Sequence, residues 1–291
     1  MRSMNRKKPS YYDHDGFLMP IGFPIEGFIS ALRYQAQPSD VFLVTYPKCG
    51  TTWTQYILWL MQHQGEPLSP SEKLEDYIPH LEEIGKETIE KLRQPRVIKT
   101  HFPRQLTPYH PAAKYIYVAR NPFDCVVSFY HHTRGFIQHY NFADGTFDDF
   151  FECFIRGEVD FGDYFDHLLP WYEYRDEENV LFLTYENMKA DLRPIIIKIA
   201  NFLGGDYLNC IENEEIINKI IVNSSLKSMK KDQQRWSSKR PKNMPPFVRK
   251  GKVGSWKDYF SLKQQQRLTE KFKIRTAGTA LETLWPKIFK T

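Results

Sequence analysis

The stretch from Phe42 to Trp53, FLVTYPKCGTTW, has the pattern of a strand, a glycine turn and the start of a helix. The free backbone N–H groups and the positive dipole end of a helix start bind anions. Gly50 lets the backbone approach a ligand closely, and the hydroxyls of Thr51 and Thr52 can donate further hydrogen bonds. The stretch therefore predicts a phosphate-binding loop, with a capped surface turn as the alternative.

Three side chains of this loop raise separate questions. Lys48 precedes Gly50, whereas the lysine of a Walker loop follows the glycine, so Lys48 can reach a group beyond the bound phosphate. Trp53 could stack on a purine, although an aromatic residue here is more often part of the core. We expect Cys49 to be a reactive thiol with a lowered pKa, because it lies at a helix start beside a lysine. A buried apolar setting would instead make it inert.

A candidate general base follows another apolar run, PRVIK. His101 comes two residues after Lys99, at the end of the expected strand. A histidine can accept a proton near neutral pH. Alone it would more often be structural, but a lysine beside it at the same sheet edge as Lys48 favours a catalytic role for His101, Lys48 and Lys99.

A second anion site is predicted from residues far apart in the sequence. Arg120 ends an apolar run, and Ser128 lies about two helical turns beyond the expected N-cap Asn121, which brings it back to nearly the same face. The run Arg249-Lys250-Gly251 also suits a phosphate, and Ser224-Ser225 lies upstream of it. Two anion sites, a purine platform and a base together indicate a nucleotide with two phosphate positions.

The elements that must position these residues form an α/β pattern. Four short β-rich runs are each followed by a polar tail and a helical pattern; they are Val41–Thr45, Val97–Lys99, Tyr115–Ala119 and Val180–Thr184. Such alternation predicts a mostly parallel central sheet flanked by helices. Ligands bind outside the carboxyl ends of strands in such sheets, which is where the polar tails fall.

Composition limits the function classes. The 291 residues suffice for one large domain or two small ones, and 41% apolar residues indicate a globular protein. A net charge of +5 does not imply a nucleic-acid partner. Eleven Lys or Arg but one acid lie between Lys227 and Lys257, which suggests a polyanionic ligand or a solvated basic face.

Several absences shape the expectations. The four cysteines show neither metal-ligand nor paired spacing, and no strand ends in the aspartate of a Walker B motif, so we expect no metal. The polar start MRSMNRKKPSYYDHDGF contains no apolar leader or anchor, so we expect a cytoplasmic protein with free thiols and no membrane partner.

Taken together and in order, five motifs resemble the cytosolic sulfotransferase family. They are TYPKCGTTW, KTHFP, YVARNPFDCVVSFYHH, LTYENMKAD and RKGKVGSWK, and the resemblance runs from about Ile21 to Trp256. It implies transfer of a sulfuryl group from 3′-phosphoadenosine 5′-phosphosulfate to a hydroxyl or amine of a small acceptor. It also implies a single α/β domain over residues 1–291, with a mobile N-terminus over 1–20 and a basic loop over 224–254 that covers the nucleotide.

The resemblance also implies residue roles. His101 becomes the general base, with Lys48 and Lys99 beside the transferred group, and Trp53 stacks on adenine. The implied nucleotide-binding residues are Lys48, Cys49, Gly50, Thr51, Thr52, Trp53, Arg120, Ser128, Tyr185, Ser224, Ser225, Leu226, Met229, Phe247, Val248, Arg249, Lys250 and Gly251.

The acceptor is less defined. The expected pocket contains Phe23, Tyr77, Ile78, His80, Leu81, His139 and Phe142, a mixture of aromatic and polar groups that favours phenolic or catecholamine-like acceptors. A steroid or carbohydrate acceptor, and a nucleotide-binding protein with weak or no catalysis, are the alternatives.

Three positions depart from the family pattern. Cys49 replaces a serine, and Leu226 replaces an aromatic residue that covers the other face of adenine. The family's dimer motif falls on KDYFSLKQQQ, where Ser261, Leu262 and Gln266 replace signature residues, so a homodimer is possible but its motif is degraded.

Overall fold

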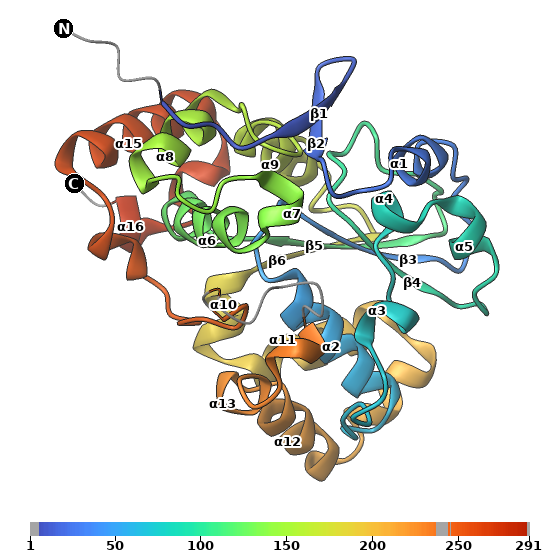
Figure 1. Ribbon diagram of the computed structural model, residues 1–291. Coiled ribbons are helices and arrows are strands. Elements are labelled where there is room, and N and C mark those ends of the chain that lie inside the picture. Colours follow the sequence, from blue (N-terminus) through green and yellow to red (C-terminus); the bar gives the residue numbers. More distant parts are fainter. Residues whose placement is uncertain (1–5, 237–243, 245, 290–291) are drawn as a thin grey trace, which may run out of the picture.

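The computed structural model describes residues 6–236, 244 and 246–289. Its centre is a sheet of four parallel strands in the order β4-β3-β5-β6, with a separate antiparallel hairpin, β1–β2 (Figure 1). The strands are β1 (Tyr11–His14), β2 (Phe17–Pro20), β3 (Val41–Thr45), β4 (Val97–Thr100), β5 (Lys114–Ala119) and β6 (Val180–Thr184). The predicted parallel α/β fold is confirmed, and each predicted strand agrees with an observed one to within one residue.

Helices fill most of the remaining chain. They are α1 (Ile25–Ala31), α2 (Thr51–Gln62), α3 (Leu74–Tyr77), α4 (Leu81–Ile84), α5 (Lys86–Glu90), α6 (Pro122–Gly135), α7 (Ile137–Tyr140), α8 (Phe147–Arg156), α9 (Tyr164–Glu173), α10 (Tyr185–Ala190), α11 (Leu192–Leu203), α12 (Glu214–Asn223), α13 (Leu226–Met229), α14 (Gln233–Trp236), α15 (Leu262–Thr276) and α16 (Pro286–Phe289). The described residues also form the 3₁₀ helices η1 (Gly205–Cys210), η2 (Ser255–Asp258) and η3 (Ala280–Thr283). Within the described residues, none of these helices has the length and apolar character needed to span a membrane.

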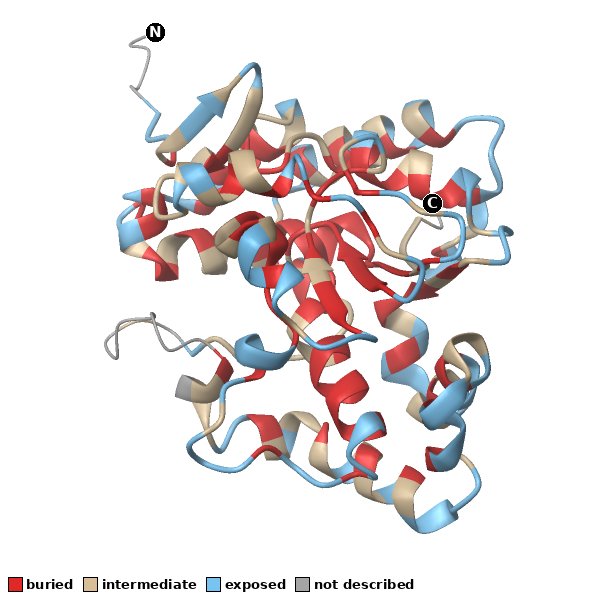
Figure 2. Ribbon diagram, turned by 90° about the vertical axis from the view of Figure 1, so that its right-hand side faces the viewer, coloured by how far each residue is buried: buried red, intermediate tan, exposed pale blue. Residues whose placement is uncertain are grey.

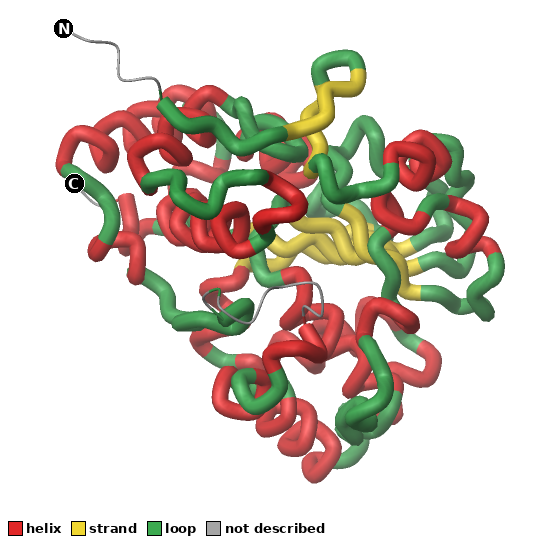
Figure 3. Tube along the Cα trace, in the orientation of Figure 1, coloured by secondary structure: helices red, strands yellow, loops and turns green. Residues whose placement is uncertain are grey.

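The sheet is buried on both faces because successive side chains of a strand point to opposite sides. Phe42 and Tyr115 belong to one apolar cluster, whereas Leu43 and Ile116 belong to the other. Helices α6, α8, α9 and α15 lie on one side of the sheet, and α2, α11 and α12 lie on the other (Figures 1 and 3). The four strands of this sheet, β3 to β6, are largely buried between these layers (Figure 2). The loops after the strands are therefore held on a rigid support.

Two predicted irregular segments contain regular structure. Residues 11–20 of the expected mobile N-terminus form the hairpin β1–β2, and Met19 of this hairpin is fully buried in the core. The expected basic loop over 224–254 contains α13 and α14, and its residues 237–243 and 245 lie outside the described part of the chain. In the described part of each segment, regular structure thus forms where the local sequence pattern is polar.

The buried carboxylate of Asp124, on α6, binds the backbone of the segment that contains Gly254 and Trp256. The predicted N-cap is confirmed, since Asn121 Oδ1 accepts from the backbone N–H of Asp124. The Asp124 carboxylate, itself 1% exposed, accepts from the backbone N–H groups of Gly254 (2.7 Å) and Trp256 (3.1 Å). Charge-assisted bonds of this kind are about twice as strong as neutral ones.

Asp124→Ala is expected to destabilise the fold. It leaves the N–H groups of Gly254 and Trp256 without acceptors, and each buried unsatisfied donor costs about 1–3 kcal/mol. We expect urea unfolding to show a loss of roughly 2–4 kcal/mol in the free energy of unfolding. Asp176→Ala, at a side chain that is 80% exposed, is the control and should change it by less than about 0.5 kcal/mol. Equal stability of the two variants would contradict the anchoring role.

Candidate active site

The predicted phosphate loop is built on two left-handed residues between β3 and α2. Lys48 has φ 71° and Gly50, the N-cap of α2, has φ 111°. This conformation favours glycine, and a Cβ at position 50 would also make a tight contact, 3.0 Å, with the ring of Tyr185. The turn directs the first N–H groups of α2 outward from the sheet edge, as an anion site requires.

A large pocket, which we call the donor pocket, lies over this loop. Helix α10, the chain around α13 and the segment 247–252 complete its walls. Seventeen of the predicted nucleotide-binding residues line it: Lys48, Gly50, Thr51, Thr52, Trp53, Arg120, Ser128, Tyr185, Ser224, Ser225, Leu226, Met229, Phe247, Val248, Arg249, Lys250 and Gly251. The eighteenth, Cys49, does not line it.

Two arginines bring positive charge to one wall of the donor pocket. Arg120 is 7% exposed; its Nη1 donates to the carbonyl of Lys48 (3.1 Å), and its buried Nε has no hydrogen-bond partner. Burial, together with the charge of Arg120, lowers the pKa of Arg249. A buried guanidinium with an unsatisfied donor, beside a partly buried second arginine, forms a site that an anion would stabilise.

Aromatic and apolar groups form another wall. The indole Nε1 of Trp53 donates to the carbonyl of Ser224 (2.9 Å), which fixes the ring, and the Trp53 ring meets that of Tyr185 edge-on at 5.5 Å. Leu226 also lines the pocket and packs over Gly251, where a Cβ would lie 2.8 Å from the leucine. The segment around 224 and the loop at 251 are thereby held against each other.

His101 is held in one tautomer by the strand that leads into the phosphate loop. Its Nδ1 lies 2.7 Å from the carbonyl oxygen of Thr45, which can only accept, so Nδ1 carries the proton of the neutral ring. Its backbone N–H donates to the buried carboxylate of Glu82 (2.5 Å). Burial first, and then the charges of His80 and Lys99, lower the pKa of His101 well below 6.5. Nε2 is therefore an unprotonated acceptor at neutral pH.

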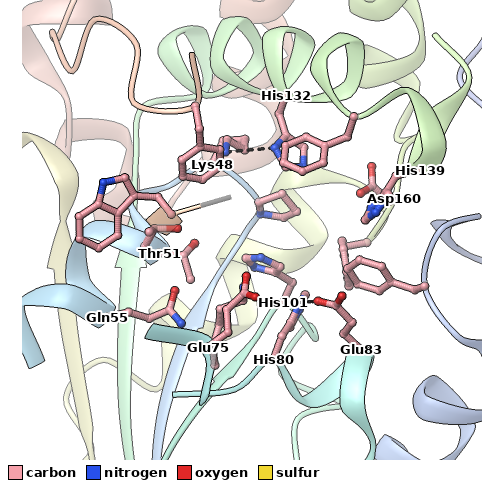
Figure 4. A pocket seen from close by; sticks show the side chains of 18 of the residues that line it. Lys48, Thr51, Gln55, Glu75, His80, Glu83, His101, His132, His139 and Asp160 are labelled. Carbon is pink, nitrogen blue, oxygen red and sulfur yellow. Dashed lines mark hydrogen bonds and ion pairs between the residues drawn. The ribbon is translucent and has the colours of Figure 1, made fainter. Parts of the chain in front are cut away.

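Beside the donor pocket lies a smaller one, the acceptor pocket, which contains His101 and Lys99. Lys48, Thr51, Thr52 and Phe247 line both pockets and so form their junction. The ammonium of Lys48 lies 3.3 Å from Nδ1 of His132 and 4.3 Å from the centre of the Phe247 ring. Figure 4 shows Lys48 and His101 facing this space from different elements.

Three of the seven predicted acceptor residues line this pocket. Phe23, His80 and His139 line the acceptor pocket, whereas Tyr77, Ile78, Leu81 and Phe142 do not. Tyr77 is 42% exposed and its hydroxyl donates to Glu72, while the other three are buried in the apolar clusters. Proximity in sequence to a pocket residue does not fix the direction in which a side chain points.

Sequence reasoning missed several lining residues. They include Gln55, Leu74, Glu75, Glu83, His132, Phe136, Asp160, Phe161, Arg235 and Trp236. The adjacent histidines of the YHH motif on α6 offered a signal for His132. Asp160 and Phe161 come from the connection between α8 and α9, where no local pattern marks a ligand contact.

Comparison with known proteins identifies the family. Residues 38–281 match the family described as the sulfotransferase domain. The chain belongs to this family. Sulfotransferase 1C2 of Rattus norvegicus is 35% identical over 283 residues, which is 90% of this chain and 92% of that protein. The amine sulfotransferase of Oryctolagus cuniculus is 36% identical over 265 residues, with 87% and 85% covered. The crystal structure of mouse sulfotransferase SULT7A1 complexed with PAP is 27% identical, with a TM-score of 0.77 over 95% of this chain and 98% of that one.

Cys49 of this sulfotransferase is not the reactive thiol that its sequence position suggests. Its side chain is fully buried, 3.8 Å from Cys125 Sγ, beneath the phosphate loop. Burial, followed by the hydrogen bond with Cys125, raises the pKa of Cys49 well above its ordinary value. Desolvation therefore outweighs the helix start and Lys48, which both favour the thiolate.

We expect native Cys49 to resist alkylation. Iodoacetamide reacts with a thiolate that it can reach. The burial of Cys49 disfavours both the access of the reagent and the ionisation of the thiol. Native and urea-unfolded protein should be treated with iodoacetamide for the same time and compared by mass spectrometry. Cys49 should be largely unmodified in the native protein when all four cysteines of the unfolded protein are alkylated. Rapid native labelling of Cys49 that nucleotide prevents would contradict the buried position.

Proposed function

We propose that this sulfotransferase transfers the sulfuryl group of 3′-phosphoadenosine 5′-phosphosulfate directly to a hydroxyl or amine of a small phenolic or catecholamine-like acceptor. The supporting observation is the junction of the two pockets, where Lys48 and the two threonines of the phosphate loop meet the cavity that contains His101. A group held by the loop and a nucleophile held beside His101 can therefore meet without movement of either site.

The donor pocket suits the charges of this nucleotide. The loop and the start of α2 would hold the 5′-phosphosulfate, and Arg120, Ser128 and Arg249 would hold the 3′-phosphate. Trp53, fixed by its bond to Ser224, would stack on the adenine. The PAP complex of the similar mouse enzyme supports this assignment.

The transfer step needs a base and positive charge at the reacting atoms. Nε2 of His101 would take the acceptor's proton as the acceptor oxygen bonds to sulfur. The bond from sulfur to the 5′-phosphate oxygen breaks, and that oxygen keeps the electron pair. Lys48 and Lys99 line the same cavity and would stabilise the charge on the leaving oxygen and the transferred group.

The size of the acceptor pocket favours a compact acceptor. Its volume is about 120 Å³, close to the roughly 150 Å³ of a protein cavity that holds one benzene molecule. This argues for a single-ring acceptor over a steroid or a carbohydrate. A protein that binds the nucleotide without turnover is disfavoured because His101 is oriented and neutral.

A transfer assay with radiolabelled donor tests the function and the base together. The wild-type enzyme should sulfate simple phenols, and His101→Ala should lower kcat about 10²–10⁴-fold with little change in nucleotide affinity. His63→Ala, at an exposed position outside both pockets, is the matched control. Near-normal turnover by the His101 variant would remove the base assignment, and failure of the wild-type enzyme to sulfate any phenol would refute the proposed function.

Arg120→Ala tests the 3′-phosphate site. Hydrogen bonds to charged groups contribute about 1.5–3 kcal/mol, so calorimetry should show at least a roughly tenfold loss of affinity for 3′-phosphoadenosine 5′-phosphate. The affinity for adenosine 5′-phosphate, which lacks the 3′-phosphate, should fall much less. Arg175→Ala, whose side chain lies outside the donor pocket, is the control. Equal losses for the two nucleotides would show that Arg120 acts only by supporting the loop.

A further inference from the structure

A buried acid of another element holds the backbone N–H of His101. Glu82, on α4, is 0% exposed and does not line the acceptor pocket. Its Oε1 accepts from the backbone N–H of His101 (2.5 Å) and from the hydroxyl of Thr100 (2.9 Å). Thr100 ends β4 and His101 follows it directly. One carboxylate oxygen therefore fixes the two residues that carry the base into the acceptor pocket.

A second buried side chain holds the carbonyl of His101. His167, on α9 and 1% exposed, lies with Nε2 3.0 Å from this carbonyl, which can only accept, so Nε2 donates. Its Nδ1 accepts from the hydroxyl of Tyr117 (2.9 Å). Burial lowers the pKa of His167 to about 4, so its ring is neutral and keeps this pattern at neutral pH. Together with the bond from Nδ1 of His101 to Thr45, the base has partners on α4, α9 and β3.

The protonation state of Glu82 suits an acceptor. Burial by itself raises the pKa of Glu82, but the charge of His80 and the hydrogen bond from the backbone of His101 outweigh this effect and lower it. The ring of His80 lies 4.9 Å from that of His101 (Figure 4). Oε2 of Glu82 lies 3.4 Å from Nε2 of His80, yet neither of these buried atoms has a hydrogen-bond partner. Among the described residues, hydrogen bonds therefore reach the carboxylate through Oε1 alone.

The position of the base depends on these backbone contacts. The ring of His101 is joined to its chain through Cβ, so a shift of the backbone moves Nε2. A misplacement of about 1 Å can lower a rate about 10²-fold, because the base must lie within hydrogen-bond reach of the proton. Glu82, Thr100 and His167 do not line the donor pocket. Loss of their bonds should therefore affect turnover and spare the binding of the nucleotide.

We propose that Glu82 is a positioning residue for the base, which it holds through the backbone N–H of His101, with His167 as its counterpart at the carbonyl. This inference rests on the proposed function, in which His101 is the base, and adds the residues that place it. The role requires the acceptor oxygen of Glu82 and not its charge, because both donors to Oε1 are neutral groups.

A pair of substitutions separates the oxygen of Glu82 from its charge. Glu82→Gln keeps an acceptor oxygen of the same reach, whereas Glu82→Ala removes it. With a phenol as acceptor, we expect kcat to fall about 10–100-fold in Glu82→Ala and to stay within about threefold of wild type in Glu82→Gln. KM for the phenol and calorimetric affinity for 3′-phosphoadenosine 5′-phosphate should change by less than about threefold in both, and the binding stoichiometry counts the folded enzyme. Glu178→Ala, at an exposed position outside both pockets, is the control.

Nuclear magnetic resonance of isotope-labelled histidine rings gives a readout that needs no turnover. In the wild-type protein at neutral pH, the His101 ring should be a single tautomer with its proton on Nδ1, and His101→Gln assigns its signals. Glu82→Ala should add a second tautomer or broaden these signals by exchange, whereas Glu82→Gln should reproduce the wild-type pattern. His167→Leu removes the donor to the carbonyl from the other side. It should also lower kcat and spare nucleotide affinity, which gives a test that does not depend on the folding of Glu82→Ala.

The outcomes separate this inference from the proposed function. Equal losses of kcat in Glu82→Gln and Glu82→Ala overturn it, since the charge would then be what matters. Parallel losses of kcat and nucleotide affinity with unchanged His101 signals also overturn it, because Glu82 would then act on stability alone. Failure of the wild-type enzyme to sulfate any phenol refutes the proposed function, and the His101 signals still decide whether Glu82 fixes this ring.

Discussion

The backbone turn from Tyr46 to Gly50 must leave its N–H groups open to an anion, and the rest of the site depends on how the chain meets this constraint. Two left-handed residues accomplish the turn, and one of them, Lys48, is not glycine. A non-glycine residue in this conformation costs about 1–3 kcal/mol and persists only where surrounding contacts fix it. Here the Lys48 carbonyl accepts from Arg120, and the Cys49 N–H donates to the carbonyl of Tyr46. The strained turn is what sends the Lys48 side chain into the acceptor pocket while its carbonyl faces the donor side.

Buried hydrogen bonds then connect the ends of neighbouring strands to one another. The carbonyl of Thr45, at the end of β3, fixes the tautomer of His101 at the end of β4. The carbonyl of Arg120, after β5, accepts from the hydroxyl of Tyr164 on α9 (2.5 Å). Glu186 on α10, after β6, accepts from the backbone N–H of Asn121 (3.0 Å). Because each catalytic strand end is held by another element instead of by water, the reacting groups are positioned before any ligand arrives.

The parts of this structure that could be predicted from the sequence are those with a local signal. Apolar runs with polar tails gave the four parallel strands, and the glycine turn before a helix gave the phosphate loop. The donor-pocket residues at the strand ends followed, because strand ends of a parallel sheet meet at one edge, whereas those around 224–229 and 247–251 came from the resemblance to the family. The prediction of a reactive Cys49 thiol was wrong, since its position in the loop gave no indication that the thiol is buried against Cys125.

The acceptor pocket was harder to predict because no local sequence pattern marks its walls. Its walls come from the hairpin region, α4, α7 and the connection after α8, which meet only in the folded chain. Phe142 was expected there because it is aromatic and near His139, yet it is packed under Gly145, where a Cβ would lie 2.1 Å from its ring. Asp160 went unnoticed because an acid in a connecting segment is ordinarily solvated, and its burial depends on Tyr140 and Phe161.

The charges of the donor pocket show how function and stability oppose each other in this fold. The charge of Arg120 adds to the effect of burial and lowers the pKa of Arg249. The empty pocket is less stable for this reason, because like charges in a partly buried site disfavour one another. A ligand of opposite charge removes that penalty. Its binding is strengthened by the amount by which the empty site was destabilised.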